Sequence, residues 1–228
     1  SGNSISLLRN GDQAYPAMLA AIDNAKDHVF LCTYIFNAGQ VATAFGEALA
    51  RAAERGVDAR LLVDGIGMLY SLRKPWKKLA KRGVRVALFM PPRLFPPNFS
   101  INLRNHRKML VCDSVAFTGG MNIADDNLTA GKTKYVQDMH FMCEGPIVDQ
   151  LRRAFLLNWG FCTNNYTALP PTTTLPCGES RCRIIMDGPG SEADILNDIY
   201  CAVINAARRS VRIMTPYFLP SHGLVSAL

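Results

Sequence analysis

The sequence predicts an α/β fold in which a mixed, mostly parallel sheet is flanked by helices on both faces. Two observations indicate this class. Short apolar runs of strand length, such as 29–36 and 57–63, alternate with segments of helical periodicity, such as 12–26 and 41–55. Hydrophobic residues make up 49% of the 228 residues, which is enough to form a sizeable core around such a sheet.

The first part of the chain alternates helix and strand, and two of the helices are followed by a glycine. Gly56 and Gly83 stand where a residue that tolerates positive φ ends a helix. The expected elements are, in chain order, helix 12–26, strand 29–36, helix 41–55, strand 57–63, helix 75–82 and strand 84–89. Strands joined by helices run parallel, so this alternation predicts a mostly parallel sheet with helices on its faces.

A proline-rich loop over 90–102 separates these elements from a second group. The later elements are a strand at 104–112, a return strand at 115–118, a strand near 138–143 and a helix from 147 to about 159. We assign residues 1–162 to a first domain. Residues 163–180 contain three consecutive threonines and three prolines and are expected to form a linker, and 181–228 begin a second, incomplete repeat.

An internal repeat supports the second domain. Residues 20–26, Ala-Ala-Ile-Asp-Asn-Ala-Lys, are echoed by 202–208, Ala-Val-Ile-Asn-Ala-Ala-Arg, and residues 33–36 are echoed by 215–218. The offset is 182 residues, so the second copy of a motif near residue 106 would fall beyond Leu228. We therefore expect a first half followed by only the opening helix and strand of a second half.

The net charge of +7 is concentrated in one segment. Residues 65–112 contain eleven Lys and Arg and no Asp or Glu. Such a basic window attracts anions, either lipid headgroups or the nucleic-acid backbone, and the alternative is an ordinary solvated basic helix. No apolar run approaches the roughly 20 residues of a membrane-spanning helix. The chain begins with Ser-Gly rather than Met, which is compatible with removal of an upstream segment that could hold an anchor.

Seven cysteines form no CxxC pair, and the four histidines have no metal-ligand spacing beside them. We therefore expect no metal and no other cofactor. Most of the cysteines lie in apolar patterns and are expected to be small buried hydrophobic residues. Their odd number indicates a reducing compartment.

One twenty-residue stretch combines groups that handle phosphate. Side chains alternate along a strand, so His106 and Lys108 project from the same side of the strand expected there. An imidazole can attack phosphorus, and a nearby ammonium neutralises the oxygens that gain charge. Gly119 and Gly120 leave room for a ligand near the backbone, and Asn122 offers an amide donor. Taken alone, a His-x-Lys pair on a strand also occurs by chance, with the histidine satisfied by packing.

This constellation resembles the signature of the phospholipase D superfamily, in which His-x-Lys is followed after four residues by Asp and then by a Gly-Gly or Gly-Ser turn ending in Asn. The matching residues are His106, Lys108, Asp113, Gly119, Gly120 and Asn122. The chain departs from the pattern in having five residues instead of six between Asp113 and the glycine pair. The resemblance implies a phospholipase D-like fold.

Within the superfamily, the chain is most similar to bacterial cardiolipin synthases, over nearly all of its length. The stretches that carry the similarity are 34–36, 52–57, 62–67, 102–108, 117–123 and 215–218. The resemblance implies phosphatidyl transfer between two phosphatidylglycerol molecules, which gives cardiolipin and glycerol. It also implies association with the bacterial inner membrane, with the catalytic domain on the reducing, cytoplasmic side.

The resemblance further implies roles for the motif residues. His106 is either the nucleophile that forms a phosphohistidine intermediate or the acid that protonates the leaving alcohol, and a partner histidine comes from the missing half or from a second copy of the chain. Lys108 and Asn122 would hold the nonbridging phosphate oxygens. Asp113 would orient its own turn or a neighbouring imidazole. The residues expected to bind substrate are Gly119, Gly120, Arg104 and Asn105.

The proline-rich loop favours a lipid over nucleic acid as the substrate. Its aromatic and aliphatic residues lie between prolines that keep them out of a helix or a central strand. We expect this loop and the basic segment before it to contact the bilayer surface. The residues expected at the membrane are Trp76, Lys77, Lys78, Leu94, Phe95 and Phe99. The alternative is a loop that packs over the site as a lid.

Three functional classes are compatible with the sequence. The favoured class is a phosphatidyltransferase or phospholipase that acts on an anionic phospholipid. The second is a homodimeric phosphodiesterase of the nuclease type, which the basic window would serve equally, although nucleic acid is not the expected partner. The third is a noncatalytic lipid-binding module. The isolated chain is expected to be inactive unless it forms a homodimer.

Overall fold

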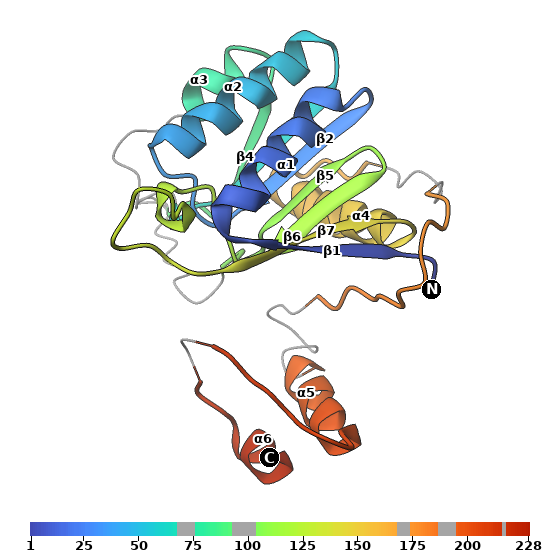
Figure 1. Ribbon diagram of the computed structural model, residues 1–228. Helices are drawn as coiled ribbons and strands as arrows, with labels where there is room; N and C mark the ends of the chain where they lie inside the picture. The colour runs from blue at the N-terminus through green and yellow to red at the C-terminus, as the bar shows by residue number, and fades with distance from the viewer. Residues whose placement is uncertain (68–75, 93–103, 168–173, 187–194, 216–217) are drawn as a thin grey trace. The chain divides into compact units, whose positions relative to one another are not determined.

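The computed structural model describes residues 1–67, 76–92, 104–167, 174–186, 195–215 and 218–228 (Figure 1). The chain divides into two compact units, Ser1–Ile184 and Ile185–Leu228. None of the described helices is both long enough and apolar enough to cross a bilayer.

A seven-stranded sheet forms the centre of the first unit, in the order β1-β7-β6-β5-β2-β3-β4. The strands are β1 Ser4–Arg9, β2 His28–Thr33, β3 Asp58–Asp64, β4 Arg85–Phe89, β5 Met109–Cys112, β6 Val115–Gly119 and β7 Met139–Glu144. β2, β3 and β4 run parallel, whereas the other four neighbouring pairs are antiparallel. The expected mixed sheet is confirmed, but fewer of its strand pairs are parallel than antiparallel. The reason is that no helical crossover separates β5, β6 and β7.

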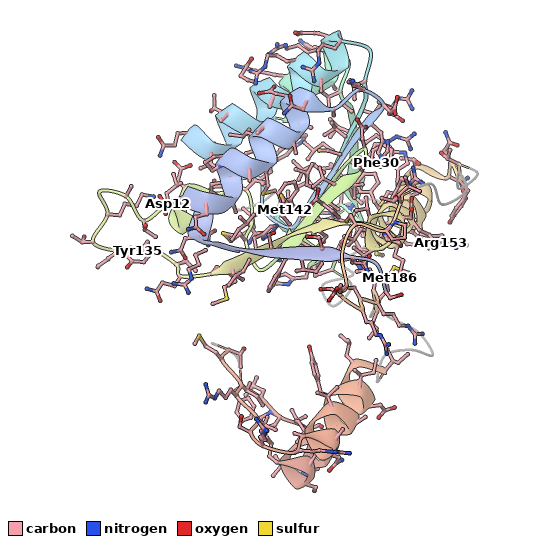
Figure 2. The ribbon with its side chains drawn as sticks, turned by 45° about the vertical axis from the view of Figure 1, so that its right-hand side comes forward. Asp12, Phe30, Tyr135, Met142, Arg153 and Met186 are labelled. Atoms are coloured by element: carbon pink, nitrogen blue, oxygen red, sulfur yellow. The ribbon has the colours of Figure 1, made fainter. Side chains whose placement is uncertain are left out.

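Helices cover both faces of this sheet. α1 Asn10–Asn24, α2 Gln40–Glu54 and α3 Trp76–Ala80 lie on one face, and α4 Ile147–Thr163 lies on the other (Figure 1). The main core lies beneath the first three helices and includes Ile22, Phe45 and Phe117. Met142 of β7 packs against this core beneath α1 (Figure 2). Phe30 faces the opposite side and stacks on Phe155 of α4, with ring centroids 4.9 Å apart.

The helix ends agree with the sequence pattern. α2 ends at Glu54, α3 ends at Ala80, and the glycines that follow, Gly56 and Gly83, have φ angles of +86° and +87°. A side chain would be strained in this left-handed conformation, so glycine ends both helices without cost. Each helix thereby turns directly into the next parallel strand.

The strand expected over residues 104–112 is shorter in the structure. β5 begins at Met109, and the preceding residues 104–108 have no strand pairing. The reason lies in the neighbouring strand, because β2 pairs with β5 only as far as Cys32 opposite Met109 and ends at Thr33. His106 and Lys108 therefore lie on an irregular segment that enters the sheet.

The described part of the segment expected to be a linker packs on the first unit. The backbone amide of Cys177 donates to Gly2 O at 3.0 Å, and that of Ser180 donates to Asn3 O at 2.9 Å. The hydroxyl of Thr174 donates to Asp149 of α4 at 2.6 Å. Residues 174–180 thus belong structurally to the first unit, which extends to Ile184.

The second unit contains α5 Ile195–Ala206 and α6 His222–Ala227. None of its described residues, 185–186, 195–215 and 218–228, is buried. The strand expected before Phe218 is not formed in residues 207–215, since a strand needs a neighbour to bind its backbone groups and the described residues of this unit supply none. As described, the unit has no core of its own.

Candidate active site

All of the motif residues except Asp113 gather at one edge of the sheet. β2, β3 and β6 end at this edge, and β5 and β7 begin there. In the antiparallel register, Thr118 lies opposite Met109 and Gly119 lies opposite His140. The register therefore brings the start of β5, the glycine turn and the start of β7 together, although they are distant in the sequence.

His106 and Lys108 meet at the ring of Tyr34, the residue after the end of β2. The ring centroid of Tyr34 lies 4.9 Å from that of His106 and 5.4 Å from Nζ of Lys108. The ammonium of Lys108 also donates to the backbone carbonyl of His106 at 2.6 Å. His106 is exposed, whereas Lys108 is only 7% exposed. The two side chains share one site with an open imidazole and a sheltered amine.

The protonation states of this pair follow from burial and charge. Burial lowers the pKa of Lys108 to about 8, while Cys32 and the carboxylates of Asp138 and Asp64 act in the opposite direction. Burial and the charge of Lys108 lower the pKa of His106, and Asp64 partly offsets this. At neutral pH the site therefore presents a neutral imidazole beside an amine that is mostly protonated.

Asn122 is oriented by the segment after β2. Its Oδ1 accepts a hydrogen bond of 3.0 Å from the backbone amide of Ile35, and the amide of Ile123 donates to Ile35 O at 3.2 Å. The acceptor end of the Asn122 side chain is thereby engaged, and its other end is an amide nitrogen with two donor hydrogens. The turn after the glycine pair is tied to the segment that carries Tyr34.

The glycine pair makes room for the start of β7. A Cβ atom on Gly119 would lie 2.7 Å from Nδ1 of His140 and 2.5 Å from Met139 O, and one on Gly120 would overlap the carboxylate of Asp138. The sequence predicted space for a ligand at these glycines. The space beside each Cα is instead filled by neighbouring protein groups, so the two glycines let β7 approach β6 closely.

Asp113 does not lie with the other motif residues. It stands at the opposite end of β5, where its carboxylate accepts hydrogen bonds from the backbone amides of Lys26, Asp27 and His28 at 2.8, 3.1 and 2.9 Å. Its Oδ1 is also 3.7 Å from Nδ1 of His28. The carboxylate thus organises the entry into β2 and contacts an imidazole there, and it is too distant to touch a ligand at His106.

Asn105 was expected to bind substrate, but it is only 1% exposed. Its Nδ2 donates to Sγ of Cys32 at 3.4 Å, and its Oδ1 accepts from the backbone amide of Arg107 at 3.3 Å. Both ends of the side chain are used within the protein, so Asn105 positions the segment around His106 instead of contacting substrate. Arg104, the other predicted binding residue of this segment, is partly exposed.

The prediction for the membrane-facing residues is wrong at Trp76. This residue begins α3, is 4% exposed and belongs to the main core together with Leu79. The two side chains are three positions apart and so share the buried face of the short helix, while Lys78 is exposed. The side chain of Lys77 and the residues Leu94, Phe95 and Phe99 lie outside the described residues.

Asp64 is a positioning residue that sequence reasoning did not assign. Its buried carboxylate accepts backbone hydrogen bonds from Ile66 and Gly67 at 2.8 and 3.0 Å and from Asn105 at 2.8 Å. The residue directly before His106 is thus fixed to the end of β3. The feature of the sequence that could have indicated this role is the Asp64-Gly65 pair at the end of an apolar strand.

His140 was also missed. It is 1% exposed, and neither of its ring nitrogens has a hydrogen-bond partner in the described part of the chain. Burial, followed by the charge of Lys108, lowers its pKa to about 4. A neutral imidazole therefore lies beneath the glycine turn.

The chemistry available at this edge is anion binding and nucleophilic attack. An ammonium, an amide and a neutral imidazole come from Lys108, Asn122 and His106, which suits a phosphodiester and its negative oxygens. Among the described residues, no group of three or more His, Cys, Asp or Glu is arranged to hold a metal ion.

Comparison with known proteins identifies the family. Residues 18–159 match the family model described as cardiolipin synthase, PLD-like domain. The major cardiolipin synthase ClsA of Bacillus subtilis is 32% identical, and a cardiolipin synthase of Listeria monocytogenes is 31% identical. Each match covers 99% of this chain and 48% of the relative, so the chain spans about half the length of these proteins.

Solved structures show the same fold. The phospholipase D family member Nuc from Salmonella typhimurium has a TM-score of 0.52 and 19% identity over 69% of this chain and 95% of its own. NucT from Helicobacter pylori has a TM-score of 0.55 and 15% identity over 70% of this chain and 98% of its own. These likenesses confirm the expected phospholipase D-like fold. Because the family model matches more than half of this chain, the chain belongs to the cardiolipin synthase, PLD-like domain family.

Proposed function

We propose that this chain carries one half of the active site of a phosphatidyltransferase of the cardiolipin synthase type. The reaction converts two phosphatidylglycerol molecules into cardiolipin and glycerol through a phosphohistidine intermediate. The observation that carries the proposal is the meeting of His106 and Lys108 at Tyr34, which puts a neutral imidazole beside a protonated amine. The relatives are named cardiolipin synthases, which supports cardiolipin as the product.

In the first half-reaction, a ring nitrogen of His106 attacks the phosphorus of one phosphatidylglycerol. A P–N bond forms as the P–O bond to the terminal glycerol breaks, and the departing oxygen takes a proton from a partner histidine. In the second half-reaction, the hydroxyl of another phosphatidylglycerol returns a proton to that partner and attacks phosphorus, and the P–N bond breaks. The same scheme holds with the roles of the two imidazoles exchanged.

Lys108 and Asn122 stabilise the phosphoryl group during both displacements. The nonbridging oxygens gain negative charge as the five-coordinate transition state forms, so fixed donors bind this state more strongly than the substrate. Lys108 contributes a charged donor from a sheltered position, where an electrostatic contact is worth more than in water. The bond from Ile35 to Asn122 holds the amide in a fixed orientation before substrate binds.

We further propose that the partner histidine comes from outside the first unit. The absence of buried residues in the described part of 185–228, together with the internal repeat, supports a second phospholipase D-like repeat that begins there and is completed by further chain. A second copy of the first unit would supply the same group. The substrate would be drawn from an anionic membrane surface, and the seven unpaired thiols favour its reducing side.

The test uses the full-length gene product and phosphatidylglycerol vesicles. We expect cardiolipin and glycerol in equal amounts, and no product from His106→Ala. Lys134→Ala, which removes an exposed lysine, is the matched control for Lys108→Ala and should retain full activity. Phosphatidic acid as the main product would make the protein a hydrolase, and cleavage of single-stranded DNA instead of lipid would replace the proposal with a nuclease.

The intermediate has its own test. Phosphatidylglycerol labelled with ³²P is mixed with the enzyme and quenched within milliseconds in alkali, where phosphohistidine survives. Label on the peptide that contains His106 is expected. Label on a different histidine peptide would assign His106 as the acid, and turnover without any protein-bound label would contradict the covalent mechanism.

A further inference from the structure

Tyr34 is in contact with both reactive groups of the site. Its ring and the imidazole of His106 have centroids 4.9 Å apart and an interplanar angle of 57°, which lies within the range of attractive aromatic pairs. The same ring is 5.4 Å from Nζ of Lys108, within the distance at which an aromatic face attracts a cation. The phenol side chain therefore connects the proposed nucleophile to the proposed phosphate-binding amine.

The backbone around Tyr34 is fixed on the side of the glycine turn. The hydroxyl of Thr33 donates to Ile35 O at 2.9 Å, which closes a turn around Tyr34. The amide of Ile35 donates to Oδ1 of Asn122, and Phe36, which is buried, forms a bridge with Ile123. The ring of Tyr34 thus projects from a short segment that is anchored directly after it.

The chain after β3 fixes Tyr34 from the other side. A Cβ atom on Gly67 would overlap the carbonyl oxygen of Tyr34 and lie 3.4 Å from its ring atom Cδ2. The amide of Gly67 is in turn held by Asp64 at 3.0 Å. Asp64 therefore supports both the backbone before His106 and the backbone against which Tyr34 packs.

The fixed position of Tyr34 matters for His106 because the side chain of His106 is exposed. An exposed imidazole samples several rotamers, and only some of them aim a ring nitrogen at a phosphorus atom. A ring packed against one side reduces that freedom before the substrate arrives. Loss of the contact should lower the rate of the chemical step more than it lowers lipid binding.

The ring of Tyr34 also affects the protonation of Lys108, because the amine is sheltered from water. The groups that face it are Cys32 from β2, Asp64 at the end of β3, Asp138 before β7 and the imidazoles of His106 and His140. The negative groups favour the ammonium form, and burial disfavours it. The negative face of an aromatic ring acts in the same direction as the carboxylates, so the ring should keep the amine charged.

We propose that Tyr34 is a positioning residue that orients the imidazole of His106 and holds the amine of Lys108 in its protonated form. The proposal rests on the function proposed above for these two residues. It concerns the aromatic ring and not the phenol hydroxyl, which gives the test a matched pair of variants. Tyr34→Phe keeps the ring, and Tyr34→Leu removes it while keeping an apolar side chain.

The first measurement is the protonation of Lys108 in the resting full-length protein, without lipid. Competitive acetylation with acetic anhydride, followed by mass spectrometry of the peptide that contains Lys108, gives the pH midpoint of its reactivity. Tyr34→Phe should keep the wild-type midpoint, and Tyr34→Leu should lower it by about half a pH unit. Midpoints are compared instead of plateaus, because a smaller side chain also changes the access of the reagent.

The second measurement is steady-state cardiolipin formation. Tyr34→Leu should lower kcat by about tenfold or more with a smaller change in KM, whereas Tyr34→Phe should stay within about twofold of the wild type. An unchanged or raised acetylation midpoint in Tyr34→Leu, or equal kcat values for the Leu and Phe variants, would overturn the role of the ring.

The two proposals fail in different ways. If His106→Ala retains activity, the proposed reaction is wrong, but the acetylation midpoints still decide whether the ring of Tyr34 stabilises the ammonium. If His106→Ala is inactive and the Tyr34 variants resemble the wild type, the reaction stands and the positioning role falls. Thermal unfolding of both variants separates a local effect from loss of fold: a Leu variant that melts far below the Phe variant would assign Tyr34 to the stability of the fold instead.

Discussion

The buried carboxylate of Asp64 accepts a hydrogen bond of 2.8 Å from the backbone amide of Asn105, the residue before His106. The carboxylate accepts two further backbone bonds, so it satisfies three amides at the edge of the sheet. Its charge also favours the protonated forms of His106 and Lys108. One buried side chain therefore combines a structural task with an electrostatic one.

Asp64→Asn should lower both stability and activity. An amide oxygen can replace one carboxylate oxygen as an acceptor, but the NH₂ group cannot accept from the remaining amide, and an unsatisfied buried donor costs about 1–3 kcal/mol. Urea unfolding measures this loss. Asp23→Asn is the control, since its ion pair with Arg51 is half exposed and should contribute less than about 1 kcal/mol. Equal losses in the two variants would contradict the role of Asp64.

Alanine in place of Gly119 should destabilise the sheet, because the new methyl group would meet Nδ1 of His140 and the backbone of Met139. Overpacking of this kind costs about 1–3 kcal/mol. Gly46→Ala in the middle of α2 should have the opposite sign, since the methyl group meets only Leu79 at 3.4 Å and alanine favours a helix by about 1 kcal/mol. Thermal unfolding of both variants checks the two signs.

His140 should make the fold sensitive to mild acid. Its pKa of about 4 in the folded protein lies below the ordinary 6.5, so the unfolded chain binds the proton more tightly. The stability contributed by the neutral ring is complete above pH 6.5 and falls as the pH decreases towards 4, by about 3 kcal/mol at most.

His140→Met removes this titration. Because neither ring nitrogen has a partner in the described residues, an apolar side chain of similar size should be tolerated at pH 7.5. The difference in unfolding free energy between variant and wild type should then grow in favour of the variant as the pH falls from 6.5 to 4.5. A difference that stays constant over this range would show that His140 does not titrate as inferred.

Asn122→Asp should separate folding from catalysis. The carboxylate keeps an acceptor for the amide of Ile35, so the melting temperature should change little. The donor hydrogens are lost and a negative charge is placed where phosphate is proposed to bind, so kcat should fall by about a hundredfold or more. Retention of activity would remove Asn122 from the phosphate site.

The pKa of Lys108 predicts where activity falls on the alkaline side of the pH–rate profile. Activity should decline above pH 8, as the amine with a pKa of about 8 loses its proton. Lys108→Arg stays protonated in this range, so whatever activity it retains should persist to higher pH. An alkaline limb at the same pH in the Arg variant would assign that titration to another group.

The shared location of His106 and Lys108 could be predicted because the two residues are close in the sequence. Two residues that are two positions apart in an extended segment share a side, and this holds for His106 and Lys108 even though β5 begins only at Met109. The helix-ending glycines were also predictable, because glycine adopts the left-handed conformation more readily than any other residue. Both cases depend on local geometry alone.

The supporting residues could not be found in this way. Asp64 and His140 lie on β3 and β7, and Tyr34 directly follows β2. The neighbours of these strands are set by the order of the sheet, and a single sequence does not give that order. Trp76 was misplaced for a related reason. Its surroundings are basic in sequence, but the five-residue helix that it begins turns the indole into the core and leaves Lys78 outside.

The hydrogen bond that the backbone amide of Asn105 donates to Asp64 joins residues that are 41 positions apart. It holds the two ends of the intervening stretch together at the edge of the sheet where His106 lies. The position of His106 therefore depends on the end of β3 as well as on β5, which begins three residues after it.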